Sequence, residues 1–149
     1  MKVEVKKFNE LTLEELYEIF RLRSEVFVVE QKCIYNDIDG KDMDSLHVMI
    51  KDSGRIEAYL RVIKPGVSYE ECSLGRVLVA KEARGKGLAR RIVREGIDCI
   101  TKGWNERKIT IGAQEYLKEF YGSFGFKAVS DMYIEDGIPH LDMRYEEDQ

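Results

Sequence analysis

The amino-acid sequence predicts an α+β fold of three layers (α/β/α), in which helices cover both faces of a mixed, mostly antiparallel sheet of about seven strands. Strand-like and helical runs follow the order β, α, β, β, β, α, β, α, β, β, which differs from the regular alternation of a doubly wound fold. The helical run at 87–103 lies between two strand-like runs. This arrangement predicts a central parallel β-α-β crossover of right-handed sense.

The first strand and the first helix are predicted from alternation and from a capping signal. Residues 2–8 alternate between polar and apolar side chains, as in a strand. Thr12 and Glu15 then have the spacing of a capping box, so a helix is expected to begin there and to continue toward Glu30. Helical spacing predicts an apolar face made of Leu13, Leu16, Tyr17 and Phe20.

The middle of the chain contains a loop and three expected strands. Asn, Asp and Gly residues break the helical pattern at 32–45, which predicts a loop. Strands at 46–52 and 55–65 follow, joined by a turn at Ser53-Gly54, and a further strand is expected at 73–80. A hairpin therefore precedes the strand that leads into the second helix.

The last third of the chain contains two helices and three expected strands. A helix is expected over 87–103, and a fifth strand follows at 108–113. A short helix within 114–126 should end at one of two glycines, and 127–145 should form two strands around an Asp136-Gly137 turn. The apolar face expected on the longer helix consists of Leu88, Ile92, Val93, Ile97 and Ile100.

Length and composition restrict the class of protein. A chain of 149 residues with 44% hydrophobic residues can bury a core of its own. The net charge of -4 and the pI near 5.4 argue against nucleic-acid binding, which requires a basic excess. Three cysteines without C-x-x-C spacing, no signal peptide and no long apolar run favour a cytoplasmic protein without a membrane partner.

A basic cluster surrounds the start of the second helix, where the helix dipole disfavours cations. The cluster consists of Lys81, Arg84, Lys86, Arg90, Arg91 and Arg94. A glycine-containing loop before a helix presents open N–H groups, so the run RGKGLA predicts an anion site. It is neither a P-loop, because Leu88 follows Gly87, nor a dinucleotide fingerprint, because Arg90 replaces the third glycine.

Arg84, Gly87 and Ala89 form the pattern Arg-x-x-Gly-x-Ala directly after a strand. This pattern resembles the pyrophosphate-binding signature of the GNAT superfamily of acetyltransferases, and the element order and the run FYGSFGF also match that family. The runs FVVEQKCIYNDIDGKD, GRVLVAKEARG, AQEYLKEFYGSFGF and EDGIPHLDM are similar to the ElaA-like branch and cover nearly the whole chain. The resemblance implies one N-acetyltransferase domain over residues 1–149, with the GNAT (acyl-CoA N-acyltransferase) fold.

The resemblance also implies a co-substrate, acetyl-CoA or coenzyme A, and no metal. The implied binding residues are Val77, Leu78, Val79, Arg84, Gly85, Lys86, Gly87, Leu88, Ala89, Arg90 and Gln114. The backbone of the first three would pair with the pantetheine arm as an added strand does, and the N–H groups of the loop would hold the pyrophosphate. Gln114 stands where many relatives have an asparagine that contacts pantetheine.

Catalytic roles follow from the resemblance and from the chemistry of acyl transfer. Tyr121 matches the tyrosine that protonates the leaving thiolate, and the Val79 N–H can stabilise the oxyanion. The attacking amine must also lose a proton. Some GNAT families use a glutamate at the position of Ser73, so another base is needed here, or water alone. The candidates are His140, His47, Glu30, Asp39, Asp42 and Glu115, and we take His140 forward with Tyr121.

Several plainer interpretations stand beside these. His47 lies in an alternating strand and is expected to be a satisfied core histidine, and a nucleophilic Cys33–histidine pair is disfavoured because the resemblance assigns the chemistry elsewhere. A calcium loop around Gly40 fails, because Tyr35 and Leu46 would occupy the first and last ligand positions. The loop at 32–45 is instead expected to give the acceptor side an acidic rim that favours a cationic amine.

The sequence therefore predicts an N-acetyltransferase that transfers acetyl from acetyl-CoA to a small-molecule or peptide amine by direct attack in a ternary complex. A non-catalytic acyl-CoA-binding module is the alternative, and nucleic-acid binding by the arginines is a distant third. The sequence does not identify the acceptor, and a homodimer is among the oligomeric states it leaves open.

Overall fold

The structure is a computed structural model that describes residues 1–148. Its strands are β1 (Lys2–Lys7), β2 (Leu46–Asp52), β3 (Arg55–Ile63), β4 (Ser73–Val79), β5 (Lys108–Gln114), β6 (Lys127–Ala128), β7 (Tyr133–Glu135) and β8 (Ile138–Glu146). Its α-helices are α1 (Leu13–Arg23), α2 (Leu88–Asp98) and α3 (Lys118–Gly122). A π-helical segment at Ser24–Glu30 extends α1, and another at Cys99–Gly103 extends α2, so both long helical runs end near the expected residues.

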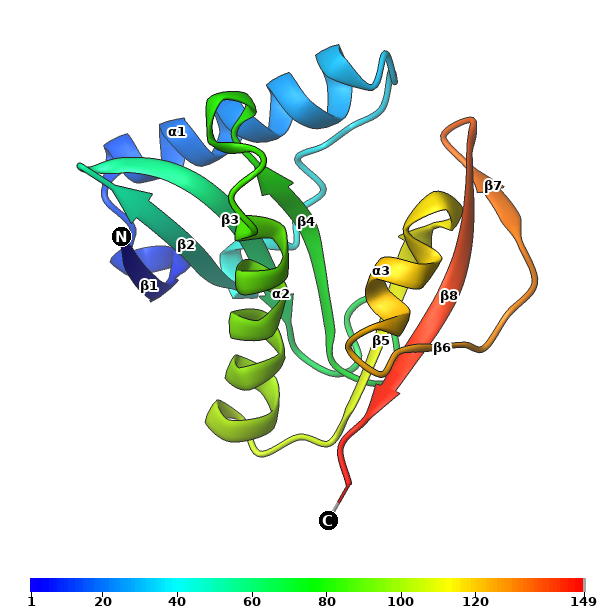
Figure 1. Cartoon of the computed structure of the whole chain (residues 1–149). Coiled ribbons are helices and arrows are strands. Elements are labelled where there is room, and N and C mark those ends of the chain that lie inside the picture. The colour runs from blue at the N-terminus through cyan, green and yellow to red at the C-terminus, as the bar shows by residue number, and fades with distance from the viewer. Residues whose placement is uncertain (149) are drawn as a thin grey trace.

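The predicted α+β architecture is confirmed, but the strands form two sheets (Figure 1). One four-stranded sheet has the order β1-β2-β3-β4, and the other has β5-β8-β6 with β7 beside β8. All strand pairs are antiparallel. The expected parallel crossover contact is confined to a bridge between Cys72 and Ile109, where the Thr110 N–H donates to the Cys72 carbonyl at 2.9 Å. Beyond this bridge β4 and β5 diverge, as Figure 1 shows.

Helices cover both faces of the first sheet. Every residue of β3 from Ile56 to Ile63 is buried, which a strand shows only when both of its faces are covered. On one face, α2 packs so closely that a Cβ on Gly96 would lie 3.0 Å from the Leu60 side chain. On the other face lies α1, whose last residue, Arg23, is completely buried. The expected apolar face of α2 is confirmed, since all five of its predicted residues are buried.

The apolar face expected for α1 is wrong at two of its four residues, since Leu16 and Phe20 are half-buried. Leu13 is 86% exposed and Tyr17 is 65% exposed. The buried face of this helix consists of Glu15, Ile19, Leu22 and Arg23. Two of these side chains are charged and are paired inside the fold, so a pattern based on hydrophobicity alone selects the wrong side of the helix.

Glu15 joins the start of α1 to the first sheet. Its carboxylate accepts from Lys6 Nζ at 2.9 Å, from Lys51 Nζ at 2.5 Å and from the Thr12 N–H at 2.8 Å, and the last contact completes the expected capping box. Burial by itself would raise the pKa of Glu15, but these hydrogen bonds outweigh it and lower the pKa to about 2.

We expect Glu15 to make folding stability depend on pH. A carboxyl whose pKa is lower in the folded chain contributes stability above its unfolded pKa, and that stability is lost as pH falls toward 2. Urea unfolding of Glu15→Gln should therefore show lower stability at pH 7 and a smaller loss between pH 4.5 and 2 than the wild-type protein. Glu14→Gln, an exposed neighbour in the same helix turn, is the control and should leave the wild-type pH dependence unchanged.

The C-terminal strands differ from the expectation by one element. Residues 127–145 form three strands, because the short β6 pairs with Arg144 and Met143 of β8 before the chain reaches β7. The Asp136-Gly137 turn is confirmed, since both residues have positive φ angles of 51° and 77° and join β7 to β8. Across residues 1–148, no helix combines the length and the apolar character that a membrane crossing requires.

Candidate active site between the two sheets

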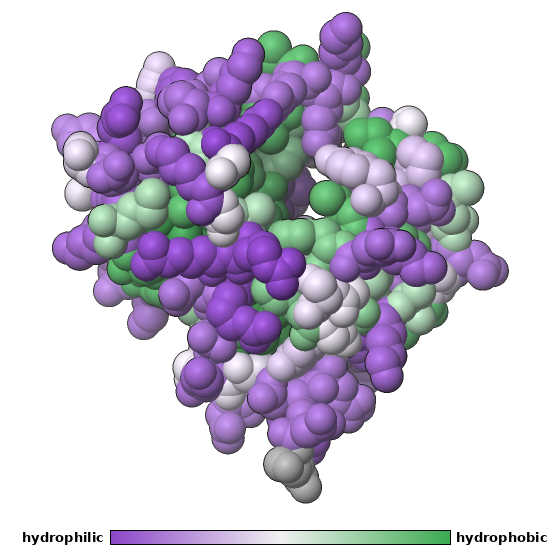
Figure 2. All heavy atoms as spheres, in the orientation of Figure 1, coloured by the Kyte–Doolittle hydropathy of each residue, from purple (hydrophilic) through white to green (hydrophobic). Residues whose placement is uncertain are grey.

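A cleft of about 800 Å³ lies where β4 and β5 diverge. Its walls come from both sheets, from the end of the π-helical segment after α1, and from the loops that precede β2 and β4. Figure 2 shows this hollow between the two halves of the molecule, with apolar side chains on its walls and hydrophilic residues around its mouth. Among the candidate residues, those that line the cleft are Val77, Leu78, Val79, Arg84, Gln114, Tyr121, His140, Glu30 and Asp39, whereas the loop and helix residues from Gly85 to Arg90 do not line it.

The edge of β4 that faces the cleft has open backbone groups. The Ala80 N–H donates to the Glu57 carbonyl of β3 at 2.8 Å. Because successive N–H groups of a strand point to opposite sides, the Val79 N–H points away from β3 toward the gap. Arg84 Nε donates to the Val79 carbonyl at 3.2 Å, so the N–H is the open group of this residue.

A bulge in β4 precedes this edge. Between the pairs Tyr59–Leu78 and Arg61–Gly75, β4 has one residue more than β3. The bulged residue is Arg76, whose φ of 53° is in the left-handed region that non-glycine residues rarely adopt. The bulge lies in the part of β4 that no longer pairs with β5, and Arg76 lines the cleft.

The loop between β4 and α2 presents a row of free amides. Gly85 and Gly87 have φ angles of 84° and 76°, and Gly87 is the N-cap of α2. The N–H groups from Gly85 to Arg90 find no acceptor within residues 1–148, and the first turn of α2 contains no acidic residue. Open amides, the helix dipole and nearby cations together favour an anion at this position.

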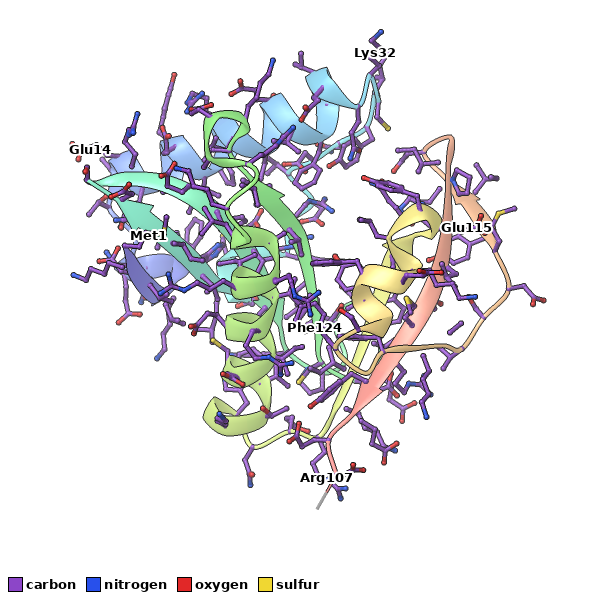
Figure 3. All side chains as sticks on the ribbon, in the orientation of Figure 1. Met1, Glu14, Lys32, Arg107, Glu115 and Phe124 are labelled. Atoms are coloured by element: carbon purple, nitrogen blue, oxygen red, sulfur yellow. The ribbon has the colours of Figure 1, made fainter. Side chains whose placement is uncertain are left out.

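The six basic residues around this loop do not converge on one point. Arg84 forms a two-pronged ion pair with Glu30, with both N–O distances at 2.7 Å. Arg90 lies over the Phe124 ring at 4.9 Å and donates to Ser123, and Arg94 lies over the same ring at 5.3 Å. Figure 3 shows Phe124 between α2 and the end of α3. The arginine expected at the pyrophosphate therefore pairs with Glu30 of the segment after α1, and both residues line the cleft.

Tyr121 extends from α3 into the cleft. Its ring packs edge-on against Phe120 at 5.2 Å and Phe126 at 5.9 Å, and 7% of the residue is exposed. The hydroxyl makes no hydrogen bond within residues 1–148. Burial raises the pKa of Tyr121 to about 12, so the phenol keeps its proton at neutral pH and is available as a donor.

His140 and Gln114 occupy paired positions on the neighbouring strands β8 and β5. His140 Nδ1 lies 2.8 Å from the Ile138 carbonyl, which only accepts, so this nitrogen carries the proton. In the neutral ring, Nε2 is then a proton acceptor, and it lies 3.8 Å from Glu135 Oε2. The ring stacks on Tyr133 at 6.0 Å, and Gln114 Nε2 makes a long contact with Gln31 at 3.4 Å.

The other proposed bases are occupied or lie elsewhere. The hydrogen bonds from Arg84 hold the pKa of Glu30 below its ordinary value. His47 is completely buried between the Tyr59 hydroxyl and the Asp42 carbonyl, so its interpretation as a core histidine agrees with its contacts. Glu115 is exposed and does not line the cleft.

Three aspartates of the 32–45 loop are paired with three arginines, which contradicts the expected acidic rim. Arg23 contacts Asp37 at 2.8 Å and Asp42 at 2.6 Å. The other contacts of this cluster are Arg61 to Asp39 and Asp42, and Arg76 to Asp37 and Asp39. Burial raises the pKa of Asp39 and Asp42, but the arginines outweigh it and lower both, so neither is a good base.

Several cleft residues were missed by the sequence analysis. Lys41, Arg61, Arg76, Tyr69 and Glu135 all line the cleft. Tyr69 donates to Asp142 at 3.1 Å and Tyr133 donates to the same oxygen at 2.7 Å, which ties the loop before β4 to β8. The Asp136-Gly137 turn signal lies next to Glu135, and the expected acceptor-side loop at 32–45 contains Lys41, but no local signal marked Arg61, Arg76 or Tyr69.

Comparison with known proteins agrees with this fold. The family model of the acetyltransferase (GNAT) domain matches residues 8–147. The protein ElaA of Escherichia coli is 39% identical over 140 residues, which cover 93% of this chain and 92% of that protein. The crystal structure of E. coli ElaA has a TM-score of 0.90 at 36% identity and covers 97% of this chain and 99% of the other.

A second solved structure, an acyl-CoA N-acyltransferase from Pseudomonas aeruginosa, has a TM-score of 0.91 at 38% identity and covers 97% of this chain and 99% of that one. These matches span nearly the full length of both partners. The chain therefore belongs to the GNAT acetyltransferase family, in its ElaA-like branch.

Proposed function

We propose that this protein is an acetyl-CoA-dependent N-acetyltransferase that transfers an acetyl group to a primary amine by direct attack in a ternary complex. The observation that carries the proposal is a pair of open backbone surfaces close together in the chain: the edge of β4 at Val79, which lines the cleft, and the free amides from Gly85 to Arg90 in the loop and helix start that follow it. The first suits an extended pantetheine arm, and the second suits a pyrophosphate.

The residues of the cleft match the needs of acyl transfer. The attack of an amine on a thioester carbonyl places negative charge on the carbonyl oxygen, and the open Val79 N–H is available to stabilise it. The thioester C–S bond then breaks, and the leaving thiolate takes a proton from the Tyr121 hydroxyl. The products are an N-acetylated amine and coenzyme A, and Tyr121 regains its proton from solvent.

His140 is the base that we propose for the amine. With Nδ1–H donated to Ile138, the free Nε2 can take a proton from an ammonium group in the cleft. Among the carboxylates and histidines considered from the sequence, it is the one that lines the cleft and is not held in an ion pair with an arginine.

The proposal treats residues 1–149 as one N-acetyltransferase domain in the cytoplasm. One continuous group of buried apolar residues extends through both sheets, from Ile19 to Met143, which supports a single folding unit. Cys33, Cys72 and Cys99 are free thiols, and a reducing compartment keeps thiols in that state.

Acetyl-CoA binding tests the anion site directly. Acetyl-CoA at 100 times its Kd should stabilise the wild-type protein by about 2.7 kcal/mol and raise its Tm. Gly87→Asp places a carboxylate where the pyrophosphate is expected, so we expect it to weaken acetyl-CoA binding at least about tenfold by charge repulsion.

Gly54→Asp is the matched control. Gly54 has a φ of 80°, and like Gly87 it has open space around its Cβ position, so the two variants carry the same backbone cost and the same added charge. Gly54 lies in the β2–β3 turn, outside the cleft. A Tm that acetyl-CoA does not move in the wild-type protein, or equal binding by both variants, would contradict the proposal. Thiol release with acetyl-CoA and a panel of amines then tests transfer.

A further inference from the structure

The wall of the cleft formed by the 32–45 loop, β3 and β4 is basic. Of the three aspartates in its ion-pair cluster, only Asp39 lines the cleft, while Asp37 and Asp42 are buried behind it. The cations that line the same wall are Lys41, Arg61 and Arg76. The three arginines of the cluster neutralise the three aspartates, so Lys41 is a cation in excess.

Lys41 has donors to spare. Its Nζ donates to Ser68 Oγ at 3.0 Å, and within residues 1–148 no carboxylate lies within 4.0 Å of it. An ammonium group has three N–H donors, so two are not used by this contact, and both Lys41 and Ser68 line the cleft. Arg76, on the same wall, uses Nη2 for Asp37 and Asp39, and its Nη1 makes no hydrogen bond to the described part of the chain.

The opposite wall has the opposite charge. Glu135 and Asp136, from the β7–β8 turn, line the cleft beside His140. The Glu135 side chain is 59% exposed and forms no ion pair with a lysine or arginine within residues 1–148, and its Oε2 lies 3.8 Å from His140 Nε2. The cleft therefore presents cations on one wall and carboxylates with the proposed base on the other.

We propose that the acceptor is a small amine that also carries a carboxylate, with the carboxylate bound by Lys41 and Arg76. This inference rests on the proposed function and specifies its acceptor class. A carboxylate accepts charge-assisted hydrogen bonds from both cations, which fixes the orientation of the molecule. Its ammonium group then points to the wall of Glu135 and His140, where it loses a proton before it attacks the thioester.

Matched acceptors test the carboxylate site. Acetyl transfer from acetyl-CoA is measured for 4-aminobutyrate against butylamine, and for lysine against cadaverine. In each pair, only the first amine carries a carboxylate. We expect kcat/KM to be at least about tenfold higher for each carboxylate-bearing amine, as a charge-assisted contact implies. Lys41→Met keeps the length of the side chain and removes its charge, so it should abolish this preference by raising KM for the carboxylate-bearing amines only.

Lys41→Met is expected to fold, because the backbone of this residue is held by other groups. The Lys41 N–H donates to Asp39 and the Lys41 carbonyl accepts from Ser45 Oγ at 2.6 Å, and neither contact involves the side chain. Lys102→Met is the control, since that side chain is 79% exposed and lies in the π-helical segment after α2, outside the cleft. It should keep the wild-type preference.

The outcomes separate this inference from the proposed function. If wild-type protein acetylates butylamine and cadaverine as well as their carboxylate-bearing partners, or if Lys41→Met keeps the preference, the carboxylate site is wrong while the transferase stands. If acetyl-CoA binds but no amine is acetylated, the proposed function fails, and the acceptor class fails with it. Competition tests the carboxylate site with a compound that has no amine to be acetylated. Butyrate should inhibit acetyl transfer by the wild-type enzyme and not by Lys41→Met.

Discussion

Replacing Tyr121 with phenylalanine should lower kcat by at least about 100-fold and leave acetyl-CoA binding within about twofold of the wild-type value. The reason is that the substitution removes only the hydroxyl. The ring keeps its edge-on contacts with Phe120 and Phe126, so the fold and the cleft wall are retained. Without the phenol, the thiolate must leave without a proton donor held beside it.

Steady-state kinetics with acetyl-CoA and a reactive amine measure kcat, and calorimetry measures binding. Tyr17→Phe is the matched control, because Tyr17 is 65% exposed on α1 and does not line the cleft. Its kcat should equal that of the wild-type protein. Unchanged turnover in Tyr121→Phe would remove the acid role, and a wild-type protein that binds acetyl-CoA without turnover would favour a non-catalytic acyl-CoA-binding module.

The second large effect concerns stability: Arg23→Met should lower the free energy of unfolding by about 3–5 kcal/mol. Arg23 is completely buried and binds Asp37 through Nε and Nη2 and Asp42 through Nη1. Its removal leaves two carboxylates that are 8% and 4% exposed with fewer partners. A buried carboxylate that loses its cation costs far more than a surface ion pair contributes.

Urea unfolding at pH 7 measures this difference, with Arg21→Met as the control. Arg21 lies two residues away on α1 and pairs with Glu18 and Glu25 at the surface, so its loss should cost no more than about 1 kcal/mol. Arg23→Lys keeps the charge without the two-pronged geometry. Its loss of free energy of unfolding should lie between the losses of Arg23→Met and Arg21→Met. A cost below 1 kcal/mol for Arg23→Met would mean that the cluster adds nothing to stability.

The same cluster makes a prediction about pH. Because the arginines lower the pKa of Asp39 and Asp42 in the folded protein, these carboxyls contribute stability above about pH 4 that is lost as pH falls through their folded pKa values. Arg23→Met should weaken the part of this acid dependence that comes from Asp42, which Arg23 contacts, while it lowers stability at pH 7. The two effects together distinguish a lost ion pair from a lost packing contact. A lost packing contact would lower the free energy of unfolding equally at pH 7 and at acidic pH.

Hydrophobic periodicity predicted α2 correctly and α1 incorrectly, and the difference has a physical cause. The buried side of α2 is apolar, so the amphipathic pattern identifies it. The buried side of α1 includes Glu15 and Arg23, whose partners lie on β1, β2 and the 32–45 loop. Since a charged residue is buried only when distant residues satisfy it, no local pattern shows such a face.

The loop at 32–45 shows the same limit at the site itself. Its aspartates indicate an acidic rim when they are read as a run of residues. Arg61 and Arg76 come from strands that follow the loop in the sequence, and together with Arg23 they neutralise it. The charge that the cleft presents on this wall is thereby reversed, and with it the class of acceptor we infer.

The sequence by itself determined the element order apart from the short strand β6, the turn positions, the glycine loop before α2 and the resemblance to the GNAT family, because each of these depends on neighbouring residues or on a short motif. The tertiary structure alone decided three other features. These are the division into two sheets at the Arg76 bulge, the pairing of Arg84 with Glu30, and the basic wall around Lys41. All three features depend on contacts between segments that are distant in the sequence, and those contacts form only when the chain has folded.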